Sequence, residues 1–372
     1  MIYLDNAANT PVDSKVLKVY NEVTTTYIAN PNSSHPLGKI AKMKIDEASE
    51  EIGKYFNCSK ESVIYTSGSS ESNNLVIKGV CDRYKDKGNH IIISGVEHSS
   101  VVAPVNHLIS KGFDVSIVSL NEDGKINLKE LKKAINKKTI LVSVCAVDGE
   151  TGAIQPIQEI ANIVKKYNNC VFHTDATQAI GKVDIDYSNV DFITFAPHKF
   201  FGLNGMGVLI NRNDTKITPL IHGGKSTTIY RSGTPVIANA IATEIALKIA
   251  TKKLKSRYKK IKKLNTLLRK EFSKLDYIHI NSPEDSIPNT LNISLINRDT
   301  KSVIEKLNQK EIYVSTTTAC SLDDIPSKSV LAITNNMELA KNTIRISISH
   351  LNTKEEIKDF LKVFKKLTKK QG

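Results

Sequence analysis

Short apolar runs alternate with amphipathic segments between residues 63 and 210, and this alternation limits the possible folds more than any other feature of the chain. Strands that are apolar throughout, each followed by a helix, are typical of a largely parallel sheet with helices on both faces. We therefore predict an α/β fold whose main sheet is mainly parallel, has seven strands and is sandwiched by helices. The predicted strands are 62–66, 90–93, 115–118, 139–144, 171–173, 191–195 and 206–210, and the predicted helices cover about 71–86, 98–111, 127–136 and 156–167.

The pattern changes after residue 236, which predicts a second unit. A chain of 372 residues is long enough for about two domains. A long basic helical stretch over 238–275 leads from the alternating region into a smaller α+β segment. We predict a large domain over 14–257 and a small domain built from 1–13 together with 258–372.

Five cysteines are scattered along the chain, and no two are spaced as a CxxC pair. This spacing disfavours a disulfide framework and a zinc site, so we expect a reducing cytoplasm and no bound metal. The longest apolar runs are far shorter than the roughly 20 residues needed to span a bilayer. The first residues also lack the basic and apolar pattern of a secretory signal. We expect no membrane role.

The net charge of +14 comes mostly from lysine, and the chain has no Trp. Proteins that read nucleic acids rely on arginine for bidentate contacts and on aromatic side chains for stacking. A Lys-, Ile- and Asn-rich composition is also what an AT-rich genome encodes. We therefore expect no direct role in nucleic-acid binding, and we interpret the lysine-rich stretch 248–263 as a solvated helix face.

Polar residues follow the predicted strands where the carboxyl ends of a parallel sheet bind ligands. The small-residue loop 67–72 opens a helix and can hold a phosphate on its free N–H groups. His98, Asp175 and Lys199 follow three other strands. A phosphate cradle, an acid, a histidine and a lysine at one edge fit pyridoxal 5′-phosphate (PLP), whose aldehyde reacts with a lysine and whose ring nitrogen pairs with an acid.

Seven motifs occur in order along more than three hundred residues: LDNAANTP (4–11), NPNSSHPLG (30–38), SGSSESNNL (67–75), HTDATQ (173–178), HKFFG (198–202), RSGTP (231–235) and TIRIS (343–347). Through these motifs the chain resembles cysteine desulfurases of the NifS/IscS type. These enzymes belong to the class V aminotransferase group of fold-type-I PLP enzymes. The resemblance implies a homodimer that converts L-cysteine to L-alanine.

The resemblance implies a role for each residue that matches a motif. Lys199 would form the Schiff base with PLP, and His98 would stack on the cofactor ring and handle protons. Asp175 would pair with the pyridinium nitrogen, and Gln178 would bond the phenolic oxygen. The phosphate would be held by Ser69, Ser70 and His198, with Thr234 reaching in from the second subunit.

The same resemblance assigns the residues that bind and desulfurate the substrate. Arg345 would clamp the substrate carboxylate, as a guanidinium does well, and Asn32 would lie in the segment that lines the substrate pocket. Cys320, in a polar loop over about 315–328 that we expect to be mobile, would take the sulfur as a persulfide. The acceptor would be an iron–sulfur scaffold or a tRNA-thiolation enzyme.

Several positions depart from the family pattern. Gly149 stands where an asparagine usually bonds the phenolic oxygen, and Ala196 replaces a serine that binds phosphate. The loop 225–230 has lost the usual sequence, and Thr317 replaces the glycine before the cysteine motif. We predict weaker PLP retention than in typical members, because each lost hydrogen bond costs about 1 kcal/mol.

Three other functions fit parts of the sequence. A related PLP lyase could act on selenocysteine or cystine, and a class V aminotransferase could act on another amino acid. A basic nucleic-acid-binding protein could keep the fold without the cofactor. A desulfurase differs from these three alternatives because it alone needs the thiol of Cys320 for turnover.

Overall fold

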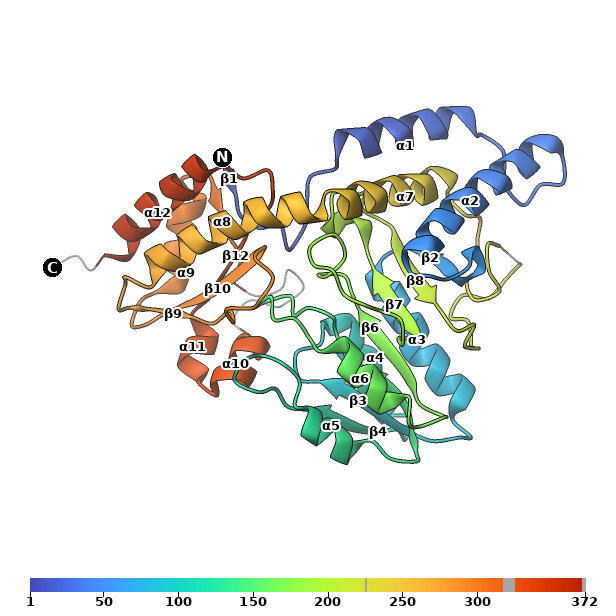
Figure 1. Cartoon of the computed structure of the whole chain (residues 1–372), viewed down its shortest axis with the longest axis horizontal. Coiled ribbons are helices and arrows are strands. Elements are labelled where there is room, and N and C mark those ends of the chain that lie inside the picture. Colours follow the sequence, from blue (N-terminus) through green and yellow to red (C-terminus); the bar gives the residue numbers. More distant parts are fainter. Residues whose placement is uncertain (225, 317–324, 370–372) are drawn as a thin grey trace.

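The computed structural model describes residues 1–224, 226–316 and 325–369 (Figure 1). Its main sheet has seven strands in the order β2-β8-β7-β6-β5-β3-β4. β3 to β7 run parallel, whereas β8 is antiparallel to both of its neighbours. The strands are β2 (Val63–Thr66), β3 (His90–Ser94), β4 (Asp114–Val118), β5 (Thr139–Ser143), β6 (Val171–Asp175), β7 (Phe192–Phe195) and β8 (Gly207–Asn211).

Helices cover both faces of this sheet because successive side chains of each strand point to opposite sides. Ile91 and Ile93 of β3 pack against α3 (Ser69–Tyr84) and α4 (Ser99–Ile109), and Ile92 joins the core on the other face. That other core also includes buried side chains from four helices. They are α1 (Ser14–Thr26), α2 (Pro36–Tyr55), α6 (Ile157–Val164) and α7 (Ile237–Lys252), and the short α5 (Leu128–Ala134) adds Leu131.

A smaller unit lies beside the sheet and has its own apolar core (Figure 1). Three antiparallel strands form it in the order β12-β10-β9. The rings of Phe272, Phe360 and Phe364 pack edge-to-face or tilted against one another in its core. Its elements are α8 (Leu254–Phe272), β9 (Ile278–Ile280), β10 (Thr290–Leu295), α9 (Thr300–Asn308), β11 (Ile312–Tyr313), α10 (Lys328–Thr334), α11 (Met337–Lys341), β12 (Thr343–Ser347) and α12 (Lys354–Thr368).

The N-terminal residues belong structurally with this smaller unit. β1 (Ile2–Tyr3) pairs in parallel with β11, and Asp5 bridges to Ser347 of β12. Further along, the backbone N atoms of Thr10 and Asp13 donate to the carbonyl oxygens of His198 and Phe201, beside the main sheet. The domain boundaries at 13 and 257 stay predictions. No helix among the described residues is both long and apolar enough to cross a membrane.

The predicted fold class is confirmed, with two differences in detail. The last predicted strand, β8, runs against the others, since the loop between β7 and β8 is short enough only for a reversal. The predicted helix over 238–275 is two helices, because α7 ends at Lys252 and α8 begins at Leu254. Lys253 between them has φ −98° and ψ 1°, outside the ideal helical values.

Candidate active site

A cavity of about 250 Å³ lies at the carboxyl edge of the main sheet and is closed on one side by the smaller unit. The loops after β2, β3, β5 and β6 and the turn after β7 all contribute to it, as expected for a parallel sheet. The predicted site residues that line it are Ser69, Ser70, His98, Asp175, Gln178, His198, Lys199 and Arg345.

Lys199 ends a short 3-10 helix (Pro197–Lys199) that directly follows β7. Its Nζ donates hydrogen bonds to the carbonyl oxygens of Ala7 (2.9 Å) and Ala8 (2.5 Å). Thr10 braces the same turn, because its backbone N and its Oγ1 both donate to the His198 carbonyl oxygen. The N-terminal strip therefore holds the lysine toward the cavity.

A hydrogen-bonded chain connects Asp175 with His98 through two residues that the sequence analysis assigned no role. Asn73 Nδ2 donates to Asp175 Oδ2 and to Ser100 Oγ, both at 2.8 Å. Ser100 Oγ lies 2.8 Å from His98 Nδ1, which also accepts from the Ser100 backbone N. Because Nδ1 accepts, the neutral His98 ring carries its hydrogen on Nε2.

Burial is the main cause of the lowered pKa of His98, and the positive charges of Lys199 and Lys328 act in the same direction. The Asp175 carboxylate opposes this shift. Burial, then Lys199 and Lys182, also lower the pKa of His198 to about 4. Both imidazoles are therefore neutral at physiological pH in this state and can accept or share protons.

The phosphate end of the cavity is formed by the first turn of α3, where Ser69 and Ser70 expose backbone N–H groups. The loop before it lies tightly against β8: a Cβ atom on Gly207 would meet the backbone C atom of Gly68 at 2.3 Å. Within the described part of the chain, four buried polar atoms without a hydrogen-bond partner belong to residues that line the cavity: Thr177 Oγ1, His198 Nδ1, Glu97 Oε2 and Arg345 Nε. Unsatisfied buried atoms in a polar cavity fit a bound anionic group.

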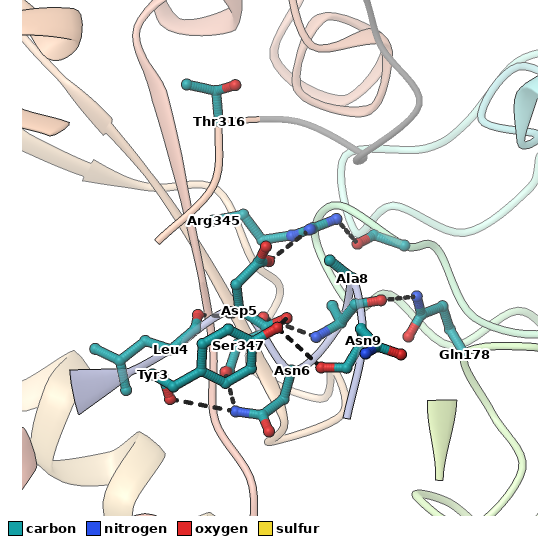
Figure 2. Close-up of polar contacts among 12 residues, drawn as sticks. Tyr3, Leu4, Asp5, Asn6, Ala8, Asn9, Gln178, Thr316, Arg345 and Ser347 are labelled. Atoms are coloured by element: carbon teal, nitrogen blue, oxygen red, sulfur yellow. Dashed lines mark hydrogen bonds and ion pairs between the residues drawn. The ribbon is translucent and has the colours of Figure 1, made fainter. Parts of the chain in front are cut away.

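Arg345 is fully buried in β12, and its side chain reaches the cavity beside Asp5 of the N-terminal strip (Figure 2). Its Nη2 donates to Asp5 Oδ1 at 2.9 Å, and its Nη1 donates to the Gly149 carbonyl oxygen at 3.2 Å. Gln178 Nε2 donates to the Ala7 carbonyl oxygen at 3.0 Å. The N-terminal strip thus contacts the arginine, the glutamine and the lysine.

Two predicted site residues among those that the structure describes do not line this cavity. Asn32 is exposed near the start of α2, and Thr234 lines a separate hollow of about 130 Å³ with Ser67 and Arg231. One chain alone does not bring either residue to the cavity. Cys320 lies outside the described residues, as does most of the predicted loop around it.

Sequence reasoning missed two buried carboxylates at the cavity, Asp148 and Glu150. They accept hydrogen bonds from Ser329 Oγ (2.8 Å) and Ser327 Oγ, respectively, at the start of α10. Burial and the nearby Asp148 raise the pKa of Glu150. Both carboxylates lie in the Asp148-Gly149-Glu150 turn, which departs from the family pattern. Their serine partners are about 180 residues away in the chain, so no local sequence pattern indicates these contacts.

Glu97 is a further buried carboxyl at the cavity, 4% exposed. Ser94 Oγ (2.5 Å) and the Cys145 backbone N (2.8 Å) donate to its Oε1. Burial outweighs these bonds and raises its pKa to about 8, and Asp175 adds to the shift. Glu97 is therefore mostly protonated at neutral pH.

The raised pKa of Glu97 predicts a pH-dependent loss of stability. Because the folded-state pKa lies above the unfolded value, Glu97 contributes stability that is complete below about pH 4.5 and is lost as pH rises through 8. We expect Glu97→Gln to remove this loss. Between pH 5 and pH 8, the free energy of unfolding of the variant relative to that of the wild type should rise by on the order of 3 kcal/mol. Urea unfolding of the apoprotein measures this, and parallel curves for the two proteins would contradict it.

A half-buried lysine, a carboxylate, a histidine and a helix N-terminus lie around one cavity at the carboxyl edge of a mainly parallel sheet. They define an α/β enzyme with lysine-based chemistry. The family model of class-V aminotransferases matches residues 2–360. The chain belongs to the class-V aminotransferase family, and within it to the NifS/IscS type.

Individual relatives cover nearly the whole chain. The cysteine desulfurase IscS of Dictyoglomus turgidum is 35% identical over 99% of this chain and 95% of its own length. A solved NifS-like protein superposes with a TM-score of 0.92, at 34% identity and 98% coverage of both chains. The structure of SspA in complex with cysteine gives a TM-score of 0.83 at 28% identity and covers 95% of this chain and all of that one.

Proposed function

We propose that this protein is a PLP-dependent cysteine desulfurase that converts L-cysteine to L-alanine and transfers the sulfur to Cys320. One observation carries the proposal: Lys199, Asp175 and His98 surround a single cavity whose far end is a helix N-terminus, in a chain of the NifS/IscS type. The structure of SspA with cysteine supports the choice of substrate.

The residues of the cavity fit PLP. The N–H groups of Ser69 and Ser70, with the unpartnered His198 Nδ1, would hold the phosphate. Asp175, already an acceptor from Asn73 and Thr177, would stabilise a protonated ring nitrogen. When bound, PLP supplies an electron sink for charge that develops at the substrate Cα.

The protein's own groups would then bind the substrate and move protons. Arg345 would orient the carboxylate of L-cysteine, because its buried guanidinium lines the same cavity as Lys199. Lys199 Nζ would carry the proton that leaves Cα, and His98 would serve as acid and base. The thiolate of Cys320 would attack the substrate sulfur, so that the C–S bond breaks, alanine leaves and a persulfide remains on the enzyme.

The assembly and the cellular role follow as parts of the same proposal. A homodimer is supported by the positions of Thr234 and Asn32, which lie outside the cavity of their own chain. We place the enzyme in the cytoplasm, where an iron–sulfur scaffold or a tRNA-thiolation enzyme would accept the persulfide sulfur.

The function is tested by measuring both products of one reaction. The purified protein, reconstituted with PLP, is mixed with L-cysteine and a reductant, and alanine and sulfide are measured together. Equal amounts of both support a desulfurase, whereas a keto acid without alanine indicates an aminotransferase. Selenocysteine and cystine in parallel reactions test the lyase alternative, which requires faster turnover of one of them than of L-cysteine.

Restoring a family residue at position 149 should tighten cofactor binding. The backbone of Gly149 lies outside the left-handed region, so its φ does not require a glycine. An asparagine can donate one further hydrogen bond into the cavity, worth about 1 kcal/mol, or roughly a fivefold lower Kd for PLP. Equilibrium titration of the apoenzyme with PLP measures Gly149→Asn against wild type. An unchanged or higher Kd would contradict the assignment of this position to cofactor binding.

A further inference from the structure

Lys182 is a buried lysine for which the proposed reaction has no use. It lies in the turn after β6, one helical turn beyond Gln178, and its side chain is 8% exposed. Its Nζ donates a hydrogen bond to Gln178 Oε1. Among the described residues, no carboxylate forms an ion pair with it. A buried ammonium without a carboxylate is costly, so its presence beside the active site needs a reason.

The hydrogen bonds of Lys182 determine how Gln178 presents its side chain. The carboxamide is held at both ends, because Oε1 accepts from Lys182 Nζ and Nε2 donates to the Ala7 carbonyl oxygen. Figure 2 shows the bond that Nε2 makes. The same Ala7 oxygen accepts from Lys199 Nζ at 2.9 Å. The ammonium of Lys182 can only donate hydrogen bonds, so the oxygen of the Gln178 amide must face Lys182. The NH₂ group of Gln178 therefore faces the Ala7 carbonyl oxygen, to which Lys199 Nζ also donates.

The charges that face Lys182 are positive. Burial is the first cause that lowers its pKa to about 7, and Lys199 and Arg345 are the next. Arg257, which pairs with Asp13 at 3.9 Å, lines a small cavity of about 20 Å³ together with Lys182 and Lys199. His350 also lines it and is neutral, because burial, then Arg257, lower its pKa to about 4. The positive charges of Lys199 and Arg345 favour a negative group close to Lys182. Because the pKa of Lys182 is about 7, such a group would change the protonation of Lys182 near neutral pH.

We propose that Lys182 is a positioning residue for the cofactor: its Nζ turns the NH₂ group of Gln178 toward the cavity, and its positive charge offsets the phenolate oxygen of PLP bonded there. This inference rests on the proposed function, since it requires PLP in the cavity. Lys182 acts through Gln178 and through its charge and forms no bond with substrate.

The inference predicts how cofactor affinity changes with pH. A phenolate bound through Gln178 favours protonated Lys182, so binding of PLP raises the pKa of Lys182 above its value of about 7 in the free protein. The contribution of Lys182 to affinity is therefore complete below about pH 7. It is lost as the pH rises from there through the pKa of the bound state.

Two substitutions separate the charge from the shape of the side chain. Lys182→Met keeps the length without charge, and Lys182→Arg keeps a charge that does not titrate. The Kd of the apoenzyme for PLP is measured at pH 6 to 9, and each variant is divided by wild type, so that the ionisations of PLP itself cancel. We expect Lys182→Met to bind about tenfold more weakly at pH 6 and equally at pH 9. Lys182→Arg should bind as wild type at pH 6 and more tightly at pH 9.

Controls distinguish the possible outcomes. Lys129→Met, on the exposed face of α5, removes one surface charge and should leave the Kd unchanged at every pH. Circular dichroism and a melting curve establish folding. If Lys182→Arg does not fold, the Kd of Lys182→Met divided by the wild-type Kd still tests the inference. A ratio that does not change with pH overturns it.

A double-mutant cycle tests whether Lys182 acts through Gln178. In a Gln178→Leu background, Lys182→Met should change the Kd at pH 6 by less than about twofold, because the group it positions is gone. A full tenfold effect in that background would overturn the positioning role. If wild-type apoenzyme binds no PLP at any pH, the proposed function itself fails, and this result is distinct from normal binding with a constant ratio.

Discussion

Replacing Lys199 by alanine is expected to lower desulfuration of L-cysteine by at least about 1,000-fold, because the variant lacks the amine that would react with the cofactor. Two other lysines are close to this region: Lys328 lines the cavity from the start of α10, and Lys182 has its Nζ bonded to Gln178 Oε1. Borohydride reduction of the PLP-loaded wild type, followed by peptide mapping, should place the cofactor on the peptide that contains Lys199. The alanine variant should give no labelled peptide.

An arginine at the same position is the matched control for structural effects. Lys199 Nζ donates to the carbonyl oxygens of Ala7 and Ala8, so alanine also removes two bonds that hold the N-terminal strip. Lys199→Arg keeps a cationic donor there but cannot react with the aldehyde of PLP. It should melt close to the wild-type temperature and be as inactive as the alanine variant. Retained turnover in the arginine variant would rule out Lys199 as the reactive lysine.

Cys320→Ala is expected to abolish sulfide release while leaving PLP binding intact, because the thiol receives sulfur and does not hold the cofactor. The four other cysteines cannot replace it. Burial raises the thiol pKa of Cys58, Cys81, Cys145 and Cys170, so little reactive thiolate exists at neutral pH. The visible absorbance of bound PLP and the rate of sulfide formation, measured on the same sample, test this prediction.

Cys58→Ala serves as the comparison, since this half-buried thiol lies outside the cavity. It should keep the full rate of sulfide release. Cys145 is the residue to examine if the prediction fails, because it is the described cysteine that lines the cavity. Sulfide release that survives Cys320→Ala and stops in Cys145→Ala would move the sulfur-accepting role to Cys145.

The sequence predicted the main sheet well because six of its seven strands, all but the edge strand β4, are buried on both faces. Strands such as Ile91–Ile93 therefore appear as continuous apolar runs that are hard to mistake. The antiparallel direction of β8 could not be predicted in this way, since an apolar run has no direction. The break at Lys253 was also missed, because the helical periodicity continues across it.

The candidate site was predictable where chemistry selects the residue type and not where packing does. Lys199, Asp175 and His98 follow strands, and the motifs give them roles. Asn73 links the acid to Ser100 through one amide group, and the sequence around it shows only a helix. The contacts of Glu150 with Ser327 and of Lys182 with Gln178 depend on how buried segments meet, which single-residue patterns do not record.

A single-turnover reaction without reductant tests the central claim most directly. The PLP-loaded enzyme is mixed with one equivalent of L-cysteine per chain, alanine is quantified, and the protein is digested for mass spectrometry. If Cys320 accepts the sulfur, about one alanine should form per chain, and the peptide that contains Cys320 should gain one sulfur atom. Alanine without added sulfur on that peptide, or added sulfur on another cysteine, would contradict it.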